Sequence, residues 1–145
     1  MKKPIHVYTD GGNYQDKLSA WGFIAIDETG IIHQDSGILV GEICSIWNIG
    51  AEIKATEFAV TWAKNNGHQL VINHDLLGLS KWAYGDWKRK NKWTKEFYNF
   101  IQTHLEYIVE FRHCRGHSGD YYNEMVDKLV TKTLKDNWHK HSPKK

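Results

Sequence analysis

The order of the expected elements along the chain is the feature that most constrains the fold. Three strand-like runs come first, at residues 5–9, 21–27 and 31–40. A helix from residue 48 to about 65, a strand at 69–73, helices at 76–82 and 94–107, a strand at 108–111 and a helix at 120–137 follow. A three-residue turn between the second and third runs predicts a hairpin. The later alternation of strand and helix favours parallel strands with helices packed on them.

The composition is typical of one globular domain with an ordinary core. At 145 residues, with 41% hydrophobic and 25% charged residues, the chain is long enough to bury such a core. We expect a single domain over residues 1–137 and a polar tail over 138–145. The net charge of +2 is too small for binding to nucleic acid through overall charge, so such binding must use a local basic patch.

The cysteines and the hydropathy pattern bear on the compartment. Cys44 and Cys114 lack metal-ligand spacing, and the first residues lead into a strand-like run instead of a secretory signal. No apolar run approaches the ~18 residues that a membrane span needs. We therefore expect free thiols, a cytoplasmic location and no membrane partner.

Two acidic residues stand out in the first half of the chain. Asp10 ends the first strand-like run, directly before Gly11 and Gly12. It is either a buried carboxylate that needs a partner or the start of an Asp-Gly turn. Glu52 lies in the first turn of the helix that Asn48 is expected to cap, where it either faces a site or complements the helix dipole.

Two more acids and a histidine stand out in the second half. Asp75 follows the strand at 69–73, so it either lines the crevice at the end of a parallel strand or caps the next helix. Asp127 lies four residues after Asn123, and the two share one face of the last helix. His117 lies in a glycine-bracketed loop before that helix, where it is either an ordinary surface residue or part of a site.

The four acids can converge, because strand ends and helix starts meet where a sheet opens. Four converging carboxylates repel one another, and a shared divalent cation relieves that repulsion. Hard oxygen ligands select Mg²⁺ or Mn²⁺ over softer metals. The acids therefore predict a Mg²⁺ site in which Mn²⁺ can substitute.

Residues 81–95 are the candidate basic patch. They carry six cations and three tryptophans, interleaved and opposed only by Asp86: Lys81, Lys88, Arg89, Lys90, Lys92, Lys95, Trp82, Trp87 and Trp93. Phosphate-neutralising charges beside flat rings suit the backbone of a duplex. The alternative is a solvated loop beside core tryptophans.

The joint order of these features resembles the type 1 ribonuclease H family over residues 5–134. The resemblance rests on Tyr-Thr-Asp-Gly-Gly at 8–12, Glu52, Asp75, and Gly-His-Ser-Gly-Asp-x-x-Asn-Glu-x-x-Asp at 116–127. It implies an α/β fold with a five-stranded mixed sheet, three antiparallel strands and then two parallel ones, flanked by helices. It also implies a metal-dependent endoribonuclease that hydrolyses the RNA strand of RNA–DNA hybrids and leaves 3′-hydroxyl and 5′-phosphate ends.

The resemblance also implies a role for each candidate residue. Two Mg²⁺ ions would be held by the family's four carboxylates, which match Asp10, Glu52, Asp75 and Asp127. His117 matches a mobile loop histidine that assists proton movement or product departure. The expected contacts with the hybrid are the backbone around Gly11, Gly12 and Asn13, which would sense the RNA 2′-hydroxyl, and Asn48, Asn123, Trp87, Lys88, Arg89 and Lys90. We expect a monomer.

Two stretches depart from the family's pattern. The family often shows Thr-Asn-Asn-Arg before the first-helix Glu, where this chain has Trp-Asn-Ile-Gly at 47–50. Asp75 is followed by Leu76, where the family often has Ser. These departures bear on nucleic-acid contacts more than on the chemistry, since all four acids are present.

Two other functions compete with this interpretation. A DNA-directed nuclease of the same fold, such as a resolvase or an integrase-like core, shares strand-end acids but generally lacks the first and last motifs. A non-catalytic hybrid-binding module would need at least one of the four acids replaced. The biological context stays open among primer removal, R-loop clearance and viral replication.

Overall fold

The computed structural model describes residues 3–15, 17–76, 78–85, 91–114 and 121–138. The strands are β1 (Ile5–Tyr14), β2 (Leu18–Asp27), β3 (Gly30–Val40), β4 (Leu70–His74) and β5 (Ile108–His113). The α-helices are α1 (Asn48–Asn66), α2 (Gly78–Ala83), α3 (Lys92–Gln102) and α4 (Tyr121–Asn137). Two short 3-10 helices are η1 (Glu42–Ile46) and η2 (Leu105–Tyr107).

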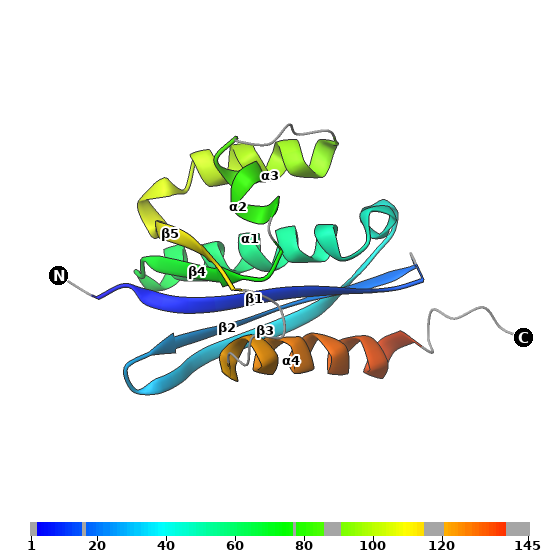
Figure 1. Cartoon of the computed structure of the whole chain (residues 1–145), viewed down its shortest axis with the longest axis horizontal. Helices are drawn as coiled ribbons and strands as arrows, with labels where there is room; N and C mark the ends of the chain where they lie inside the picture. Colours follow the sequence, from blue (N-terminus) through cyan, green and yellow to red (C-terminus); the bar gives the residue numbers. More distant parts are fainter. Residues whose placement is uncertain (1–2, 16, 77, 86–90, 115–120, 139–145) are drawn as a thin grey trace, which may run out of the picture.

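The strands form one mixed sheet in the order β3-β2-β1-β4-β5. β2 is antiparallel to both β1 and β3, whereas β4 is parallel to both β1 and β5. α1, α2 and α3 lie on one face of the sheet and α4 lies on the other (Figure 1). The predicted sheet, three antiparallel strands and then two parallel ones between helices, is confirmed.

Three apolar clusters hold the layers together. One lies between the sheet and α1, a second joins α1 to α2 and α3, and a third lies between the sheet and α4. Phe23, Phe97 and Val126, one from each cluster, are at most 1% exposed. Because helices cover both faces, β2 is buried along nearly its whole length and shows no alternation of apolar and polar residues.

β1 is longer than the sequence predicts. It does not end at Gly11 and Gly12 but continues to Tyr14, because β2 pairs with it along that whole length. Asp10 therefore lies inside a strand, and the alternative of an Asp-Gly turn is wrong. Tertiary pairing has overridden the local turn chemistry of the two glycines.

The start of α1 also differs from the expectation. Asn48 is the first helical residue and does not cap the helix, because Trp47 occupies the N-cap position. The Trp47 side chain makes no capping hydrogen bond, and its amide donates to the carbonyl oxygen of Cys44 in η1 at 3.1 Å. Glu52 consequently falls in the second turn of α1. Gly67 ends the helix in the left-handed conformation, close to the end expected at about residue 65.

α3 ends earlier than expected, and the side chain of Asn91 caps its start. Asn91 accepts a hydrogen bond from the amide of Thr94 at 2.9 Å and completes a capping box. The helix ends at Gln102, and the next residues form η2, in which Leu105 is 46% exposed and not part of the core. The expected single helix over 94–107 is thus two elements.

The remaining expectations concern thiols, a bulge and the tail. Cys44 and Cys114 are both free thiols, as expected. Gly37, which as a glycine within a strand suggested either a bulge or a strand end, is neither, because the β2–β3 register shifts at residues 25–26 and β3 continues to Val40. Residues 139–145 of the expected tail lie outside the described part, and Trp138 packs against Tyr14 with ring centroids 4.9 Å apart.

Within the described ranges, no helix combines the length and apolar character that crossing a membrane requires.

Gly11 sets the distance between β1 and α1. A Cβ atom at this position would lie 2.5 Å from the backbone nitrogen of Glu52 and 2.7 Å from the carbonyl carbon of Ala51. On the other face of β1, a Cβ atom at Gly12 would lie 2.8 Å from Cδ1 of Leu134 in α4. A side-chain end can rotate away, whereas the backbone of a helix must shift as a whole.

We expect Gly11→Ala to lower the free energy of unfolding by roughly 2–3 kcal/mol, because α1 must move away from β1. Gly12→Ala is the matched control and should cost about 1 kcal/mol or less, because only side-chain ends must move. Urea unfolding of both variants measures the difference. Equal losses would show that α1 shifts as easily as the side chains of α4.

Candidate active site

Three carboxylates converge beside the middle of β1. One oxygen from each of Asp10, Glu52 and Asp75 lies within 4.8 Å of the other two. The parallel register explains one pair: Tyr8 lies opposite Asn73, so two residues further along Asp10 comes level with Asp75. Glu52 comes from α1, at the point where the backbone of that helix lies directly against Gly11 of β1.

The two innermost carboxylates are held by the protein itself. Asp10 is 6% exposed and Glu52 is 2% exposed. The hydroxyl of Thr9 donates to Oε1 of Glu52 at 2.8 Å, and the amide of Gly11 donates to the carboxylates of both acids. The sequence pattern did not single out Thr9. Strand alternation was the available signal, since Thr9 and Gly11 share the face of β1 that meets α1.

Burial raises the pKa of Asp10 and the pKa of Glu52 well above the usual carboxyl range. Repulsion from neighbouring carboxylates adds to this, from Glu52 and Asp75 on Asp10 and from Asp75 on Glu52. The hydrogen bonds from Thr9 and Gly11 lower the pKa of Glu52 but do not reverse its direction. The metal-free cluster therefore retains protons at neutral pH.

This donor set fits a hard divalent cation. The converging ligand atoms are all carboxylate oxygens, which suit Mg²⁺ and Mn²⁺ better than softer metals. A bound cation would replace the retained protons and remove the repulsion between the carboxylates.

Asp127 lies next to this cluster. Its side chain hydrogen-bonds to the carboxyl group of Asp10, but Asp127 is exposed on α4 and is not part of the 4.8 Å group found among the described residues. It borders a surface cavity of about 350 Å³. Asn123, one turn earlier on α4, is buried. The structure thus brings three of the four predicted acids together and joins the fourth to Asp10.

α2 begins at Gly78, three residues after Asp75, so Asp75 does not directly precede that helix as the capping alternative expected. Next to Asp75, His74 is fully buried in β4 and was not singled out by the sequence pattern. Its signal was an imidazole at the end of a strand that begins with three apolar residues.

The predicted contacts to nucleic acid are placed in part. Asn48 is exposed at the start of α1. The side chain of Asn13 is engaged within the protein, because its Nδ2 donates to Oγ of Ser19 at 2.9 Å. β2 pairs with residues 11–13 along one edge of β1, whereas β4 pairs with the other edge only as far as Tyr8. The pairing with β4 therefore does not reach the predicted contact residues 11–13.

The basic segment is described only at its two ends. Lys92 forms an ion pair with Glu42 at 2.9 Å, and Trp82 and Trp93 pack against the cluster of α2 and α3. These contacts describe the two ends of the segment and do not decide between the basic patch and the solvated loop. Five predicted site residues lie outside the described residues: Trp87, Lys88, Arg89, Lys90 and His117.

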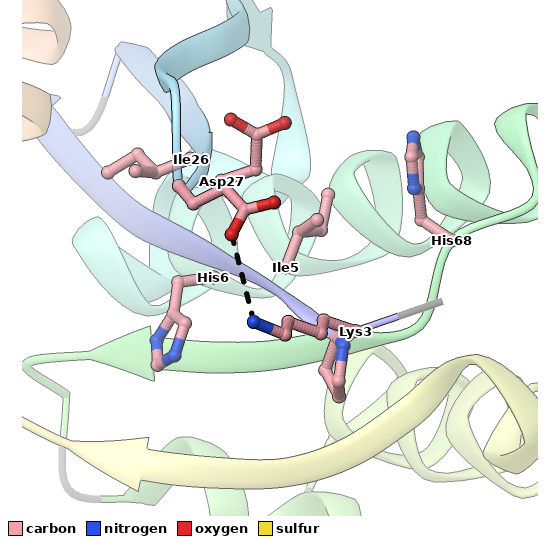
Figure 2. A pocket seen from close by; sticks show the side chains of 8 residues that line it. Lys3, Ile5, His6, Ile26, Asp27 and His68 are labelled. Carbon is pink, nitrogen blue, oxygen red and sulfur yellow. Dashed lines mark ion pairs between the residues drawn. The ribbon is translucent and has the colours of Figure 1, made fainter. Parts of the chain in front are cut away.

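A separate cavity of about 660 Å³ lies at the start of β1 (Figure 2). Lys3, His6, Asp27 and His68 contribute to its walls. Lys3 and Glu28, which both line the cavity, form an ion pair of 3.7 Å. None of the three converging carboxylates borders this cavity.

Related sequences identify the family. A family model described as RNase H matches residues 2–135 of this chain. The chain belongs to the RNase H family of nucleases. A ribonuclease H of Wolbachia sp. subsp. Drosophila simulans (strain wRi) is 28% identical over 151 residues, which cover 93% of this chain and 98% of that relative. A ribonuclease H of Orientia tsutsugamushi (strain Boryong) is 27% identical over 144 residues, covering 88% of this chain and 80% of that relative.

Solved structures of the RNase H family share the fold. RNase H1 of the halophilic archaeon Halobacterium salinarum matches with a TM-score of 0.76 at 19% identity, covering 92% of this chain and 99% of that one. The RNase H1 named LC11, in a complex with an RNA/DNA hybrid, matches with a TM-score of 0.69 at 20% identity, covering 90% of this chain and 99% of that one.

We expect Asp10→Asn to stabilise the metal-free protein at neutral and alkaline pH. A pKa that is raised in the folded state makes a contribution to stability that is fully present below the usual carboxyl pKa of about 4 and is lost as pH rises through the raised value. The wild type should therefore lose this contribution between acidic and alkaline pH, whereas the asparagine variant should not. The gain should be roughly 1–3 kcal/mol at about pH 8.

Urea unfolding in EDTA at about pH 5 and about pH 8 measures this gain. Asp27→Asn is the control, since hydrogen bonds from Thr29 lower the pKa of Asp27, and it should gain nothing at the higher pH. Saturating Mg²⁺ should reverse the order of wild type and Asp10→Asn. A gain that is equal at both pH values would contradict the assignment of the raised pKa to Asp10.

Proposed function

We propose that this chain is an endoribonuclease that hydrolyses the RNA strand of RNA–DNA hybrids with two divalent ions, Mg²⁺ or Mn²⁺, and leaves 3′-hydroxyl and 5′-phosphate ends. The convergence of Asp10, Glu52 and Asp75 within 4.8 Å, in a chain of the RNase H family, carries the proposal. The relative that was solved with an RNA/DNA hybrid supports the class of substrate.

Asp10, Glu52, Asp75 and Asp127 would hold the ions. Asp10 is the best candidate to contact both, because Glu52 and Asp75 lie beside it and Asp127 hydrogen-bonds to it. When bound, the ions supply an activated water and stabilise the leaving 3′-oxygen. The protein's own part is to fix the ligands in advance, as the bond from Thr9 to Glu52 does.

The buried acids also couple the site to pH. Because burial raises the pKa of Asp10 and the pKa of Glu52, both groups must release protons before their oxygens bind a cation. Metal affinity should therefore increase with pH. In addition to the roles of the metal-binding acids, we assign to His117 a role in proton movement or product departure.

Selection of RNA requires contact with the 2′-hydroxyl. Asn48 supports such a contact because it is exposed at the start of the helix that carries Glu52. Since the side chain of Asn13 is bonded within the protein, the backbone of residues 12–13 is the better candidate on β1. The segment with Trp87, Lys88, Arg89 and Lys90 would bind the hybrid backbone.

The decisive test is incubation with labelled RNA–DNA hybrid, double-stranded DNA and double-stranded RNA, in Mg²⁺ and in EDTA. We expect cleavage of the RNA strand of the hybrid alone and only with Mg²⁺. Asp10→Asn should retain less than about a tenth of the activity, whereas the surface variant Asp27→Asn should retain nearly all of it. Cleavage of double-stranded DNA would favour a resolvase-like nuclease, and binding without cleavage a non-catalytic module.

The basic segment should position the duplex without affecting the ions. Replacing Lys88, Arg89 and Lys90 together by Ala should weaken hybrid binding much more than it lowers the single-turnover cleavage rate. Each lost phosphate contact should flatten the dependence of log Kd on log salt by about one unit. Binding of the inactive Asp10→Asn form at several salt concentrations, with and without the triple change, measures this, and identical slopes would leave the solvated-loop interpretation standing.

A further inference from the structure

The backbone around Asp75 is held at three consecutive carbonyl oxygens. The amide of Cys114 donates to the carbonyl oxygen of His74 at 2.6 Å. Nε2 of His113 lies 3.1 Å from the carbonyl oxygen of Asp75, and Nδ1 of His74 lies 2.9 Å from the carbonyl oxygen of Leu76. The turn at residues 74–76, which follows β4 and carries Asp75, is therefore fixed by donors from β4 and from the end of β5.

Both imidazoles must act as donors, because a carbonyl oxygen only accepts. His74 therefore carries its hydrogen on Nδ1, and His113 carries one on Nε2. The other ring nitrogen of His74, Nε2, is buried and has no partner among the residues that the structure describes. An apolar side chain would fill this position without leaving a buried nitrogen unsatisfied, so the hydrogen bond to Leu76 is what distinguishes histidine here.

The two rings stand together at the ends of parallel strands. β4 and β5 pair so that His74 lies opposite His113, and their ring centroids are 5.8 Å apart. His74 is 0% exposed and packs edge-on against Phe111 of β5, again with centroids 5.8 Å apart. β5 thus influences the site although no ligand of the 4.8 Å group comes from its described residues.

Asp75 needs such a hold more than the other two acids do. It is the least buried of the three, and it lies just beyond the last residue of β4. Repulsion from Asp10 and Glu52 pushes its carboxylate outward. Hydrogen bonds outside the ligand shell are the usual means of keeping a metal ligand in place.

We propose that His74 and His113 are positioning residues for Asp75: their N–H groups fix the turn at 74–76 and hold the Asp75 carboxylate where it binds the metal. This inference rests on the proposed function, because that function assigns Asp75 to a metal ion. Neither imidazole belongs to the group of converging ligand atoms found among the described residues.

Matched pairs of variants separate the hydrogen bond from the ring. His113→Gln keeps a donor near Nε2, and His113→Leu removes it. Because His113 is exposed, leucine there creates no cavity in the core. His74→Asn keeps a donor near Nδ1, and His74→Leu removes it. Urea unfolding of all four variants identifies any global loss of stability, and the exposed His113 pair decides the matter if the buried pair fails to fold.

Two measurements are made on the full chain. Electron paramagnetic resonance of Mn²⁺ gives the metal affinity without substrate, and hybrid cleavage is followed against Mg²⁺ concentration. His113→Leu should weaken Mn²⁺ binding about tenfold and raise the half-saturating Mg²⁺ concentration by a similar factor. The maximal rate at saturating Mg²⁺ should change much less, and His113→Gln should stay within about threefold of the wild type in both measurements.

Two results would overturn the positioning role: Mn²⁺ affinity unchanged in His113→Leu, or equal losses in His113→Leu and His113→Gln, which would implicate the ring and not its donor. The proposed function fails on a different result, a wild type that binds Mn²⁺ but leaves the RNA strand of the hybrid intact. The Mn²⁺ affinities of the variants still decide the positioning role in that case. A wild type that binds no Mn²⁺ would overturn both.

Discussion

The missing side chain at Gly11 lets the backbone of α1 lie directly against β1, and the position of Glu52 depends on that contact. A helix at an ordinary distance from the sheet would leave Glu52 too far from Asp10 to share a cation. Burial raises the pKa of both carboxylates. The metal-free state is therefore less stable around neutral pH, and under the proposed function a bound cation would relieve the repulsion and complete the site.

The parallel half of the sheet determines how the third acid arrives. β1, β4 and β5 run in the same direction, so Asp75 leaves β4 level with Asp10 while the end of β5 lies alongside. β5 can then fix the turn after β4 through His113 and the amide of Cys114. The antiparallel pairing of β1 with β2 has a different effect. It extends β1 to Tyr14, beyond the pairing with β4, so that the strand continues past the site.

Much of this could be predicted from the sequence, because it depends on local patterns. The order of elements, the hairpin of β2 and β3 and the parallel strands of the later half follow from periodicity and from turn chemistry. The full arrangement of the mixed sheet follows from the resemblance to the ribonuclease H family. What failed depends on how a segment pairs or packs with other elements and not on the segment's own residues. β2 turns the Gly11-Gly12 pair into strand, and η1 leads into α1 so that Asn48 is helical.

The supporting residues of the site were missed for the same reason. Thr9 and His113 acquire their roles only once strand faces and register are known, since each bonds to a residue far away in the sequence. His74 bonds to Leu76, only two residues away, but its position opposite His113 depends on the register of β4 and β5. A threonine before an aspartate or a histidine at a strand end has many ordinary explanations. Register between strands is the information that a single sequence supplies least directly.

The candidate site has a fixed half and an open half. Asp10, Glu52 and Asp75 are bound into the sheet and α1 by Thr9, by the Gly11 amide and by the bonds around the 74–76 turn. Asp127 is exposed on α4, and its connection to the cluster is the hydrogen bond to Asp10. Under the two-ion proposal, one ion would enter a preformed set of ligands and the other would have to order an exposed side chain, which has an entropic cost. The two ions would therefore differ in affinity, and the second would depend more on what the substrate's phosphate contributes to its coordination.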